Sequence, residues 1–421
     1  MKQKILWITN ISTKNFVELT NVKSNGLWID TLIPFFESSE EFEIAIATIG
    51  KTKKILRKKI SRIEYYLLPG DNSFHYNRSK KKSLQDWEEV FNSFQPNIVM
   101  IWGTECLHSS NAVKISLLKK IPFIVFVQGI LSTIYKHKYG KVNLLSRIKS
   151  FSIRDLLKLS FSPFTNFDEI KKLKNEAFIL NNSNGIIVEN NWSKNIIMDL
   201  LSDKLKVFYN LNLPVNNLFM NSKSSFNSNF NELIISSISI SNPSKGPHLL
   251  IKAANTLKIR KIPFHIYFTG KDPHRLIFYR RTWFQNYIIK LIKDFNLRNN
   301  ISFTGEVPQN ELFKLLTSSS IFVSPSFVEN HSSSIKEAML IGLPVLTTDV
   351  GGIKEYFFNN KNGYFFETNN EKDLSEKIIY LFQNRNKLIE FSNESKKYKV
   401  NNEDIFRNLV DIYKNLTKKI Y

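Results

Sequence analysis

The 421-residue sequence predicts an α/β fold made of two domains of similar size. Short apolar runs alternate with longer amphipathic stretches along most of the chain, which is typical of β-α-β units around a parallel sheet. The length exceeds the roughly 250–300 residues at which a single hydrophobic core stops growing. The polar, low-complexity stretch 221–231 (NSKSSFNSNFN) separates the two runs of alternation and is predicted to be the linker. We therefore expect two halves facing each other across a cleft, beyond the carboxyl ends of their strands.

The first domain is predicted to span residues 1–220. Its expected strands are short apolar runs at residues 4–9, 43–49, 98–102, 123–127 and 185–188. Helical spacing predicts helices over 28–37 and 111–120. Residues 140–178 look helical but irregular, and we expect them to form an insertion over this domain.

The second domain is predicted to span residues 232–400, where the alternation restarts. Its expected strands are residues 233–239, 265–269, 301–304, 321–324 and 345–347. Its expected helices are residues 247–258, 282–295, 309–317, 332–341 and 371–384. The tail, residues 401–421, again has helical spacing and is expected to pack back on the first domain.

The formal net charge of +22 is unevenly distributed. Lys51–Arg62 (KTKKILRKKISR) holds seven basic residues and no acidic one, and Arg78–Lys82 adds four more. Nucleic acid, a membrane surface or an anionic substrate could attract such charge, and a general bias toward Lys, Asn, Ile and Phe is the competing explanation. Because we expect the basic runs in loops and helices rather than on strands with interleaved aromatic residues, we favour an anionic membrane surface over nucleic acid.

Cysteine content and apolar runs predict the compartment. The single cysteine, Cys106, cannot form an internal disulfide, which suits a reducing environment. The N-terminal apolar run 5–8 is too short for the core of a signal peptide, and no run of about 18 apolar residues occurs. We therefore expect a cytoplasmic protein, peripheral at the inner face of the cell membrane where the basic runs bind.

The segment Ser324–Glu355 (SPSFVENHSSSIKEAMLIGLPVLTTDVGGIKE) is the most informative for chemistry. A predicted strand ends in a Pro-Ser turn, Glu329 follows, and three serines precede a helix that stops before Gly342. Serine suits a helix start, and the free backbone N–H groups there attract an anion. Glu337 lies about one turn inside the helix, so that its carboxylate can face the same site and accept from vicinal hydroxyls such as those of a ribose.

This segment resembles the C-terminal domain of retaining glycosyltransferases of family 4, which have the GT-B fold of two Rossmann-like domains. The signature of that family is a Glu, seven residues, a second Glu and Ala, then a Gly-x-Pro-Val strand followed by Gly-Gly. The matching residues are Glu329, Glu337, Ala338, Gly342, Pro344, Val345, Gly351 and Gly352. The Glu-Asn opening with serines behind it is similar to a subgroup of bacterial surface-polysaccharide transferases, such as those of capsule or O-antigen synthesis.

The resemblance implies a hexosyltransferase that uses a UDP- or GDP-linked sugar and a glycan or polyprenyl-linked acceptor, with retention of configuration. Glu329 would contact the donor sugar and Glu337 would hold the ribose. The backbone that would meet the sugar and the diphosphate belongs to Asn330, His331, Ser332 and Ser333. Nucleic acid is not an expected partner.

The resemblance also implies a phosphate-binding lysine before a glycine at the end of the second domain's first strand. Lys245 and Gly246 stand at this place. The family tends to carry an arginine five residues earlier, where this sequence has Ile240. Another basic residue would then have to replace that cation, and Lys271 is a candidate.

In the first half the resemblance is less sharp but points to four residues. Gly26 is expected to shape a turn near the donor. Gln128 stands where the family often has a histidine that reaches the donor sugar; an amide can bind a hydroxyl but cannot act as a general base. Glu105 and His108 lie on the expected acceptor-facing loop, although an ordinary histidine near a helix start is an equal reading of His108.

No metal or cofactor is predicted. The sequence has no Asp-x-Asp pair and no His/Cys cluster with ligand spacing, so Lys245 and helix-terminal amides would have to neutralise the diphosphate. Three alternatives stay open: a sugar-nucleotide epimerase of the same fold, a non-enzymatic protein that binds nucleic acid or membrane through its basic runs, and a degenerate transferase kept as a scaffold.

Overall fold

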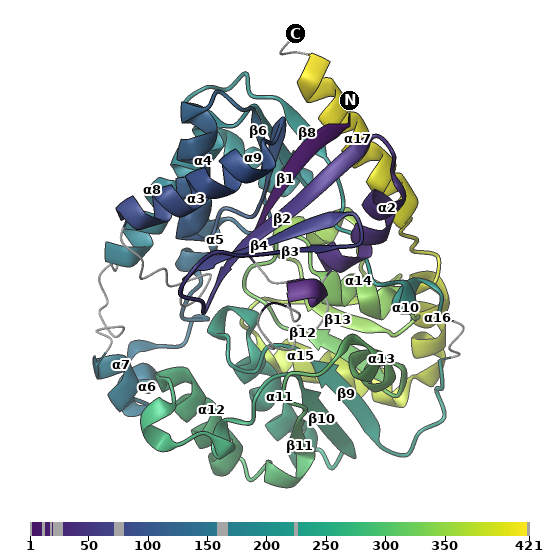
Figure 1. The fold of residues 1–421 in the computed structure, drawn as a ribbon. Coiled ribbons are helices and arrows are strands. Elements are labelled where there is room, and N and C mark those ends of the chain that lie inside the picture. The colour runs from purple at the N-terminus through teal and green to yellow at the C-terminus, as the bar shows by residue number, and fades with distance from the viewer. Residues whose placement is uncertain are drawn as a thin grey trace. The chain divides into compact units, whose positions relative to one another are not determined.

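The computed structural model describes residues 2–10, 13–16, 19, 28–70, 80–157, 167–222 and 226–418. The chain forms two compact units (Figure 1). Unit 1 comprises residues 1–132, 167–216 and 401–421, and unit 2 comprises residues 133–166 and 217–400. The predicted α/β architecture with two sheets is confirmed. Gly26 and residues 78–79 of the second basic run lie outside the described residues.

An eight-stranded sheet forms the centre of unit 1, in the order β3-β4-β2-β1-β5-β6-β7-β8. Its neighbouring strands run parallel except β3 and β4, which are antiparallel. The strands are β1 (Gln3–Thr9), β2 (Phe42–Gly50), β3 (Leu56–Ile60), β4 (Ile63–Pro69), β5 (Ile98–Trp102), β6 (Phe123–Phe126), β7 (Gly185–Val188) and β8 (Phe208–Asn210). Every residue of β5 (IVMIW) is buried, as expected for a parallel strand with both faces covered.

Helices lie on both sides of this sheet (Figure 1). They are α2 (Ile33–Ser38), α3 (Lys80–Phe94), α4 (Leu107–Leu118), α8 (Phe167–Asn182), α9 (Asn191–Leu200) and α17 (Asn402–Lys418), with α5 (Leu131–Lys136) at the unit boundary. The last helix, α17, comes from the C-terminal end of the chain. The fully buried Tyr413 accepts a hydrogen bond from Trp7 Nε1 at 3.0 Å, and Asn402 both donates to and accepts from the backbone of Val215. The C-terminal tail is thus part of the core of unit 1.

A six-stranded sheet forms the centre of unit 2, in the order β11-β10-β9-β12-β13-β14, and its neighbouring strands all run parallel. The strands are β9 (Leu233–Ser237), β10 (Phe264–Phe268), β11 (Ile301–Phe303), β12 (Ile321–Ser324), β13 (Val345–Thr348) and β14 (Gly363–Phe366). The helices are α6 (Leu144–Lys149), α7 (Ile153–Leu157), α10 (Asn217–Met220), α11 (Pro247–Ile259), α12 (Trp283–Asp294), α13 (Gln309–Thr317), α14 (Ser333–Leu340), α15 (Glu371–Gln383) and α16 (Arg385–Ser395). One apolar core from β9, β10, α11 and α12 joins these layers.

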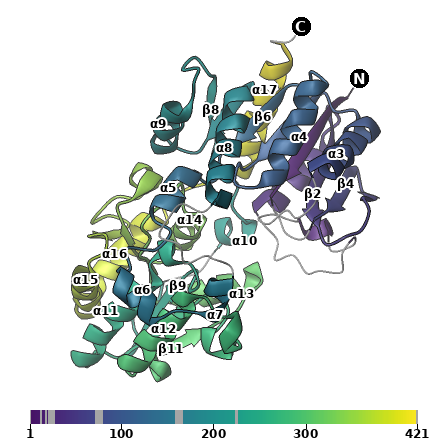
Figure 2. The same ribbon diagram turned by 90° about the vertical axis from the view of Figure 1, so that its left-hand side faces the viewer.

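The segment 140–178, predicted as an insertion over the first domain, is divided between the two units. Its residues 167–178 lie in α8 of unit 1, and residues 158–166 lie outside the described residues. Residues 133–166 belong to unit 2, where α6 and α7 lie beside α12 (Figures 1 and 2). Asp155 accepts a hydrogen bond from the backbone N–H of Trp283, and the side chain of Asn286 donates to the carbonyl of Phe151 at 3.2 Å. The physical reason is local: the buried backbone N–H of Trp283 at the start of α12 has no partner within its helix, and Asp155 supplies the acceptor.

The sequence predicted loops or helices for the basic run Lys51–Arg62. This prediction is wrong for residues 56–60, which form β3. This strand lies at the edge of the sheet with three exposed cations at its centre (LRKKI), so it lacks the apolar alternation that marks buried strands. No aromatic residue stands on β3, and thus the strand offers no stacking platform for bases.

No helix in the described ranges combines the length and the apolar character needed to span a bilayer.

Candidate functional site

Each sheet has one point at which the chain reverses its direction of strand addition. In unit 2 the order runs from β9 outward to β11 on one side, and then restarts with β12 on the other side of β9. In unit 1 the corresponding point lies between β1 and β5. Loops leaving the carboxyl ends of such strand pairs diverge, which leaves room for a ligand. Each unit therefore has one favoured position for a site.

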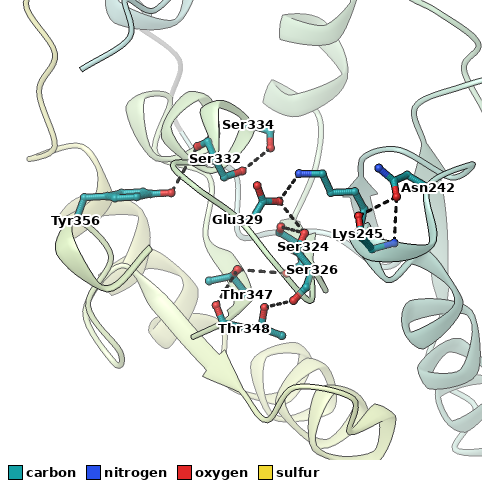
Figure 3. A network of polar contacts seen from close by, with 11 residues as sticks. Asn242, Lys245, Ser324, Ser326, Glu329, Ser332, Ser334, Thr347, Thr348 and Tyr356 are labelled. Carbon is teal, nitrogen blue, oxygen red and sulfur yellow. Dashed lines mark hydrogen bonds and ion pairs between the residues drawn. The ribbon is translucent and has the colours of Figure 1, made fainter. Parts of the chain in front are cut away.

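In unit 2 an ion pair spans this position. Lys245 Nζ lies 2.7 Å from Glu329 Oε1, and Ser326 Oγ donates to the same oxygen at 2.7 Å (Figure 3). Lys245 follows β9 and Glu329 follows β12. Glu329 is buried, whereas Lys245 is partly exposed. The arrangement places one accessible cation and one held carboxylate at the reversal point of the sheet.

The loop that carries Lys245 is fixed by a side-chain cap. Asn242 Oδ1 accepts from Ser244 N at 3.0 Å and from Ser244 Oγ at 2.8 Å, which closes the short 3-10 turn Pro243–Lys245. Gly246 then adopts a φ of 68°, and a Cβ there would lie 1.9 Å from the carbonyl oxygen of Pro325. Gly246 is therefore required by the backbone of the neighbouring loop.

The loop that carries Glu329 is fixed from β13. Thr347 Oγ1 and Thr348 Oγ1 donate to the carbonyls of Ser324 and Ser326, at 3.2 and 2.5 Å (Figure 3). Gly351 has a φ of 62°, and a Cβ there would lie 1.6 Å from the carbonyl oxygen of Glu329. A glycine at this turn therefore lets the backbone of Glu329 approach closely.

The first turn of α14 lies directly after Glu329. Ser332 occupies the N-cap position, but its hydroxyl makes no cap hydrogen bond and instead lies 3.0 Å from Ser334 Oγ. The serines therefore do not cap this helix in the way their sequence suggested. The N–H groups of its first turn keep the partial positive charge that favours an anion.

Glu337, on α14, has an unusual environment. Burial raises the pKa of its carboxyl to about 8. Within the described part of the chain the structure gives this carboxyl no hydrogen-bond donor. A ligand that brings hydroxyl donors would stabilise the ionised form and lower the pKa.

In unit 1 a hydrogen bond also spans the reversal point. Asn10, just after β1, donates through Nδ2 to Glu105 Oε2 at 2.9 Å, and Glu105 follows β5. Gly103 has a φ of 94°, and a Cβ there would lie 2.4 Å from both of these groups. The backbone N–H of Gly129, after β6, also donates to Glu105. Glu105 thus joins the ends of three strands.

A second carboxyl lies close by. Glu176, on α8, accepts from Thr104 Oγ1 at 2.9 Å and from the backbone N–H of Leu131 at 3.2 Å. Burial, together with the charge of Glu176, raises the pKa of Glu105 to about 7. Burial raises the pKa of Glu176 to about 7 as well. The two groups therefore titrate near neutral pH as a coupled pair.

The raised pKa values make a prediction about stability. In the unfolded chain both carboxyls ionise near pH 4.5, so between pH 4.5 and about 7 the native state binds more protons, and stability falls as pH rises through this window. The variant Glu176→Gln keeps an acceptor oxygen but cannot ionise. We expect the difference in melting temperature between this variant and the unmodified protein to grow in favour of the variant as pH rises from about 5 to 8. Thermal unfolding across this range measures the difference, with the exposed Glu88→Gln as control; a difference independent of pH would contradict the assignment.

Three comparisons with known proteins bear on these sites. Residues 220–398 match the family model of glycosyl transferases group 1. The structure is similar to that of Alr3699/HepE of Anabaena, determined in complex with UDP and glucose, with a TM-score of 0.65 and 16% identity over 99% of both chains. The chain has the GT-B fold. Its likeness to HepE shows the fold alone.

Two relatives extend the comparison of this GT-B chain. It is 31% identical over 168 residues to the poly(ribitol-phosphate) alpha-N-acetylglucosaminyltransferase of Staphylococcus aureus strain COL, which is 39% of this chain but only 31% of that enzyme. It is 25% identical over 342 residues to the uncharacterized glycosyltransferase MJ1178 of Methanocaldococcus jannaschii, 78% of this chain and 83% of that protein. The chain therefore spans about a third of the first relative's length and most of the second's.

The structure brings most of the predicted site residues of the GT-B chain together in unit 2. They are Lys245, Gly246, Glu329, Asn330, His331, Ser332, Ser333 and Glu337. Gln128 and Glu105 follow β6 and β5 in unit 1. His108 lies inside unit 1, fully buried and stacked on Trp87, with Nε2 3.3 Å from the carbonyl oxygen of Thr9. Packing in the core of unit 1 is enough to explain a histidine at this position. Its contact with an acceptor stays a prediction.

The predicted replacement of the missing arginine has a clear geometry. Ile240 is buried in the core of unit 2, and its side chain lies 3.1 Å from where a Cβ of Gly270 would be. Lys271, the proposed substitute, pairs with Glu306 at 3.4 Å and is exposed. Because its charge is directed to Glu306, the structure gives no contact between Lys271 and the Lys245–Glu329 pair.

Sequence reasoning missed Asn10, Asn242, Ser326 and Glu176. The first three follow predicted strand ends at the reversal points, so the sheet order would have identified them. Glu176 comes from the middle of α8, where no sequence signal marks it. No group of three or more His, Cys, Asp or Glu side chains suited to a metal occurs among the described residues. Metal independence stays a prediction.

Proposed function

We propose that this chain transfers a sugar from a nucleoside diphosphate-sugar to a glycan or lipid-linked acceptor. One observation carries the proposal: the Lys245–Glu329 ion pair at 2.7 Å, at the reversal point of a parallel sheet and beside the first turn of α14. A diphosphate needs a cation and backbone donors, and this position offers both. Lys245 would exchange its contact with Glu329 for one with phosphate when the donor binds.

The remaining roles follow the sequence prediction. Glu329 would then accept from a hydroxyl of the donor sugar, and Glu337 from the two ribose hydroxyls. The backbone from Asn330 to Ser333 would meet the sugar and diphosphate. Gly246 would act indirectly, because its missing side chain lets the loop after β12 approach Lys245.

Two comparisons support the donor and acceptor classes. HepE was determined with UDP and glucose bound, and the Staphylococcus aureus relative is a transferase of N-acetylglucosamine to poly(ribitol-phosphate). We propose a UDP- or GDP-linked hexose as donor, and a surface polysaccharide or polyprenyl-linked glycan as acceptor. Membrane contact in the cytoplasm would give access to the latter.

The chemistry that the residues support is departure of the nucleoside diphosphate. Lys245 and the amides of α14 would stabilise the charge that develops on the leaving phosphate, without a metal ion. The acceptor hydroxyl would attack on the same face, with the leaving phosphate taking its proton, so that configuration is retained. In unit 1, Glu105 would bind acceptor hydroxyls and Gln128 a hydroxyl of the donor sugar.

Nucleotide binding tests the proposal. We expect one of UDP, GDP, ADP or CMP, or its sugar conjugate, to raise the melting temperature by several degrees with EDTA present, because a ligand at about 100 times its dissociation constant stabilises by ~2.7 kcal/mol. The shift should be lost in Lys245→Ala. The absence of any shift in a cooperatively melting protein would favour the scaffold or nucleic-acid alternatives.

A further inference from the structure

The short helix α6 of unit 2 exposes its apolar side chains to solvent and buries an arginine. On α6, Leu144, Leu145 and Ile148 are 54%, 61% and 50% exposed, whereas Arg147 is 7% exposed. A surface helix in water shows the opposite arrangement, with its apolar stripe toward the core. The orientation of α6 thus needs an explanation.

Specific contacts hold α6 in this orientation. The guanidinium carbon of Arg147 lies 3.4 Å from the ring centroid of Tyr139 and 5.7 Å from that of Trp283. Asn143 caps the helix, accepting from Ser146 N–H at 2.8 Å. Because both the cap and the buried cation are formed, the outward apolar side chains belong to an ordered surface.

A second group of exposed apolar side chains continues this surface. Ile153 on α7 is 46% exposed, and Phe278 and Tyr279 on the turn Phe278–Arg280 are 63% and 47% exposed. Arg154 joins the two segments by donating to the carbonyl of Arg280 at 2.9 Å. α6 packs against α12, and α7 packs against the turn Phe278–Arg280 (Figure 1). We call Leu144, Leu145, Ile148, Ile153, Phe278 and Tyr279 the apolar face.

The chain around the apolar face is strongly basic. Residues 131–154 contain six Lys or Arg and no Asp or Glu, and residues 273–281 contain three Arg and no acid. An acid adjoins each stretch. Asp155 is buried and accepts from Ser152 and from the backbone of Trp283, and Asp272 pairs with Arg275 and Arg298. The apolar face is therefore bordered by cations, and a protein partner with a neutral surface would leave this charge unused.

We propose that the apolar face docks unit 2 on an anionic lipid bilayer. Aliphatic side chains would enter the boundary between headgroups and acyl chains, the two aromatic rings would lie at headgroup level, and the bordering cations would attract anionic lipids. This surface differs from the basic run Lys51–Arg62 of unit 1. The use of the surface to reach a lipid-linked acceptor rests on the proposed function, whereas the docking itself does not.

Vesicle flotation of the full chain tests the docking. We expect binding to vesicles that mix phosphatidylglycerol with phosphatidylcholine, and much weaker binding to phosphatidylcholine alone. The triple variant Leu144→Ser/Leu145→Ser/Ile148→Ser should lower the partition coefficient at least about tenfold, because three aliphatic side chains no longer enter the bilayer. All three positions are exposed, so the melting temperature should stay unchanged.

Matched variants separate the possible results. The double variant Leu205→Ser/Ile259→Ser removes exposed aliphatic groups outside the apolar face and should bind like the unmodified chain. If the triple variant binds normally, while Lys53→Gln/Lys58→Gln/Lys59→Gln abolishes binding, the proposal is overturned. It is also overturned if light scattering without vesicles shows a dimer that the triple variant converts to a monomer. An unchanged nucleotide thermal shift in the triple variant keeps docking distinguishable from donor binding.

Discussion

Replacing Lys245 by alanine is expected to lower kcat/KM for the nucleotide sugar by about 10²- to 10³-fold, the usual cost of losing a donor to charge that develops in the transition state. In the structure this ammonium group is the partner of Glu329, at 2.7 Å. The variant therefore has a second effect, because it leaves a buried carboxylate without its cation. We expect a loss of about 1–3 kcal/mol in unfolding free energy, which lowers the melting temperature of the ligand-free protein.

A double variant separates the two effects of Lys245. In Lys245→Ala/Glu329→Gln the buried charge is gone, so the melting temperature should recover while transfer stays low. The control is Lys252→Ala, on the adjacent α11, where the lysine lies 3.9 Å from Glu371. This variant should change neither the melting temperature nor kcat/KM. Steady-state kinetics and thermal unfolding of the four proteins give the answer. Unchanged kcat/KM in folded Lys245→Ala would exclude a role on phosphate.

Replacing Glu337 by alanine is expected to weaken donor use by roughly 10- to 150-fold, which corresponds to the ~1.5–3 kcal/mol of hydrogen bonds to a charged group. No loss of melting temperature without ligand is expected, since this carboxyl has no hydrogen-bond donor within the described residues. Its folded pKa of about 8, against 4.5 in the unfolded chain, means that the group costs stability as pH rises from 4.5 to 8. The variant should therefore gain stability at the alkaline end.

Proton release gives a sharper test of Glu337. Ribose hydroxyls favour the ionised carboxylate, so nucleotide binding at pH 7 should release a proton from Glu337. Calorimetry in buffers of different ionisation enthalpy measures this release. Glu337→Gln should abolish it, and Glu376→Gln, at an exposed carboxyl on α15, should leave it intact. Equal proton release by Glu337→Gln and the unmodified protein would be evidence against the ribose contact.

The sequence predicted the parallel strands well where both faces are buried. Runs such as IVMIW and FIVF are apolar because every position is buried, and their order along the chain implies β-α-β units. It failed at β3, β8 and β14, which lie at sheet edges, where one side of the strand meets solvent and the apolar signal is diluted. It also failed at β4, next to the basic run.

The candidate site was predictable where the chemistry is local in sequence. Glu329, the serines and Glu337 lie within one short segment, so spacing alone places them near one helix start. Their partners come from elsewhere: Ser326 was hidden in a turn, and the pairing of Glu105 with Asn10 and its proximity to Glu176 depend on sheet order. Sequence spacing carries no information on such contacts, which only the topology creates.

The C-terminal helix α17 has a consequence for how the protein is made. Unit 2 is complete once residue 400 has left the ribosome, whereas unit 1 still lacks Tyr413 against Trp7 and Asn402 against Val215. The N-terminal sheet is synthesised first but acquires its full core last, across a sequence separation of 406 residues. Until α17 packs, the aromatic side chains of the N-terminal sheet need protection from aggregation. We therefore expect chaperones to act during translation mainly on the N-terminal part of unit 1.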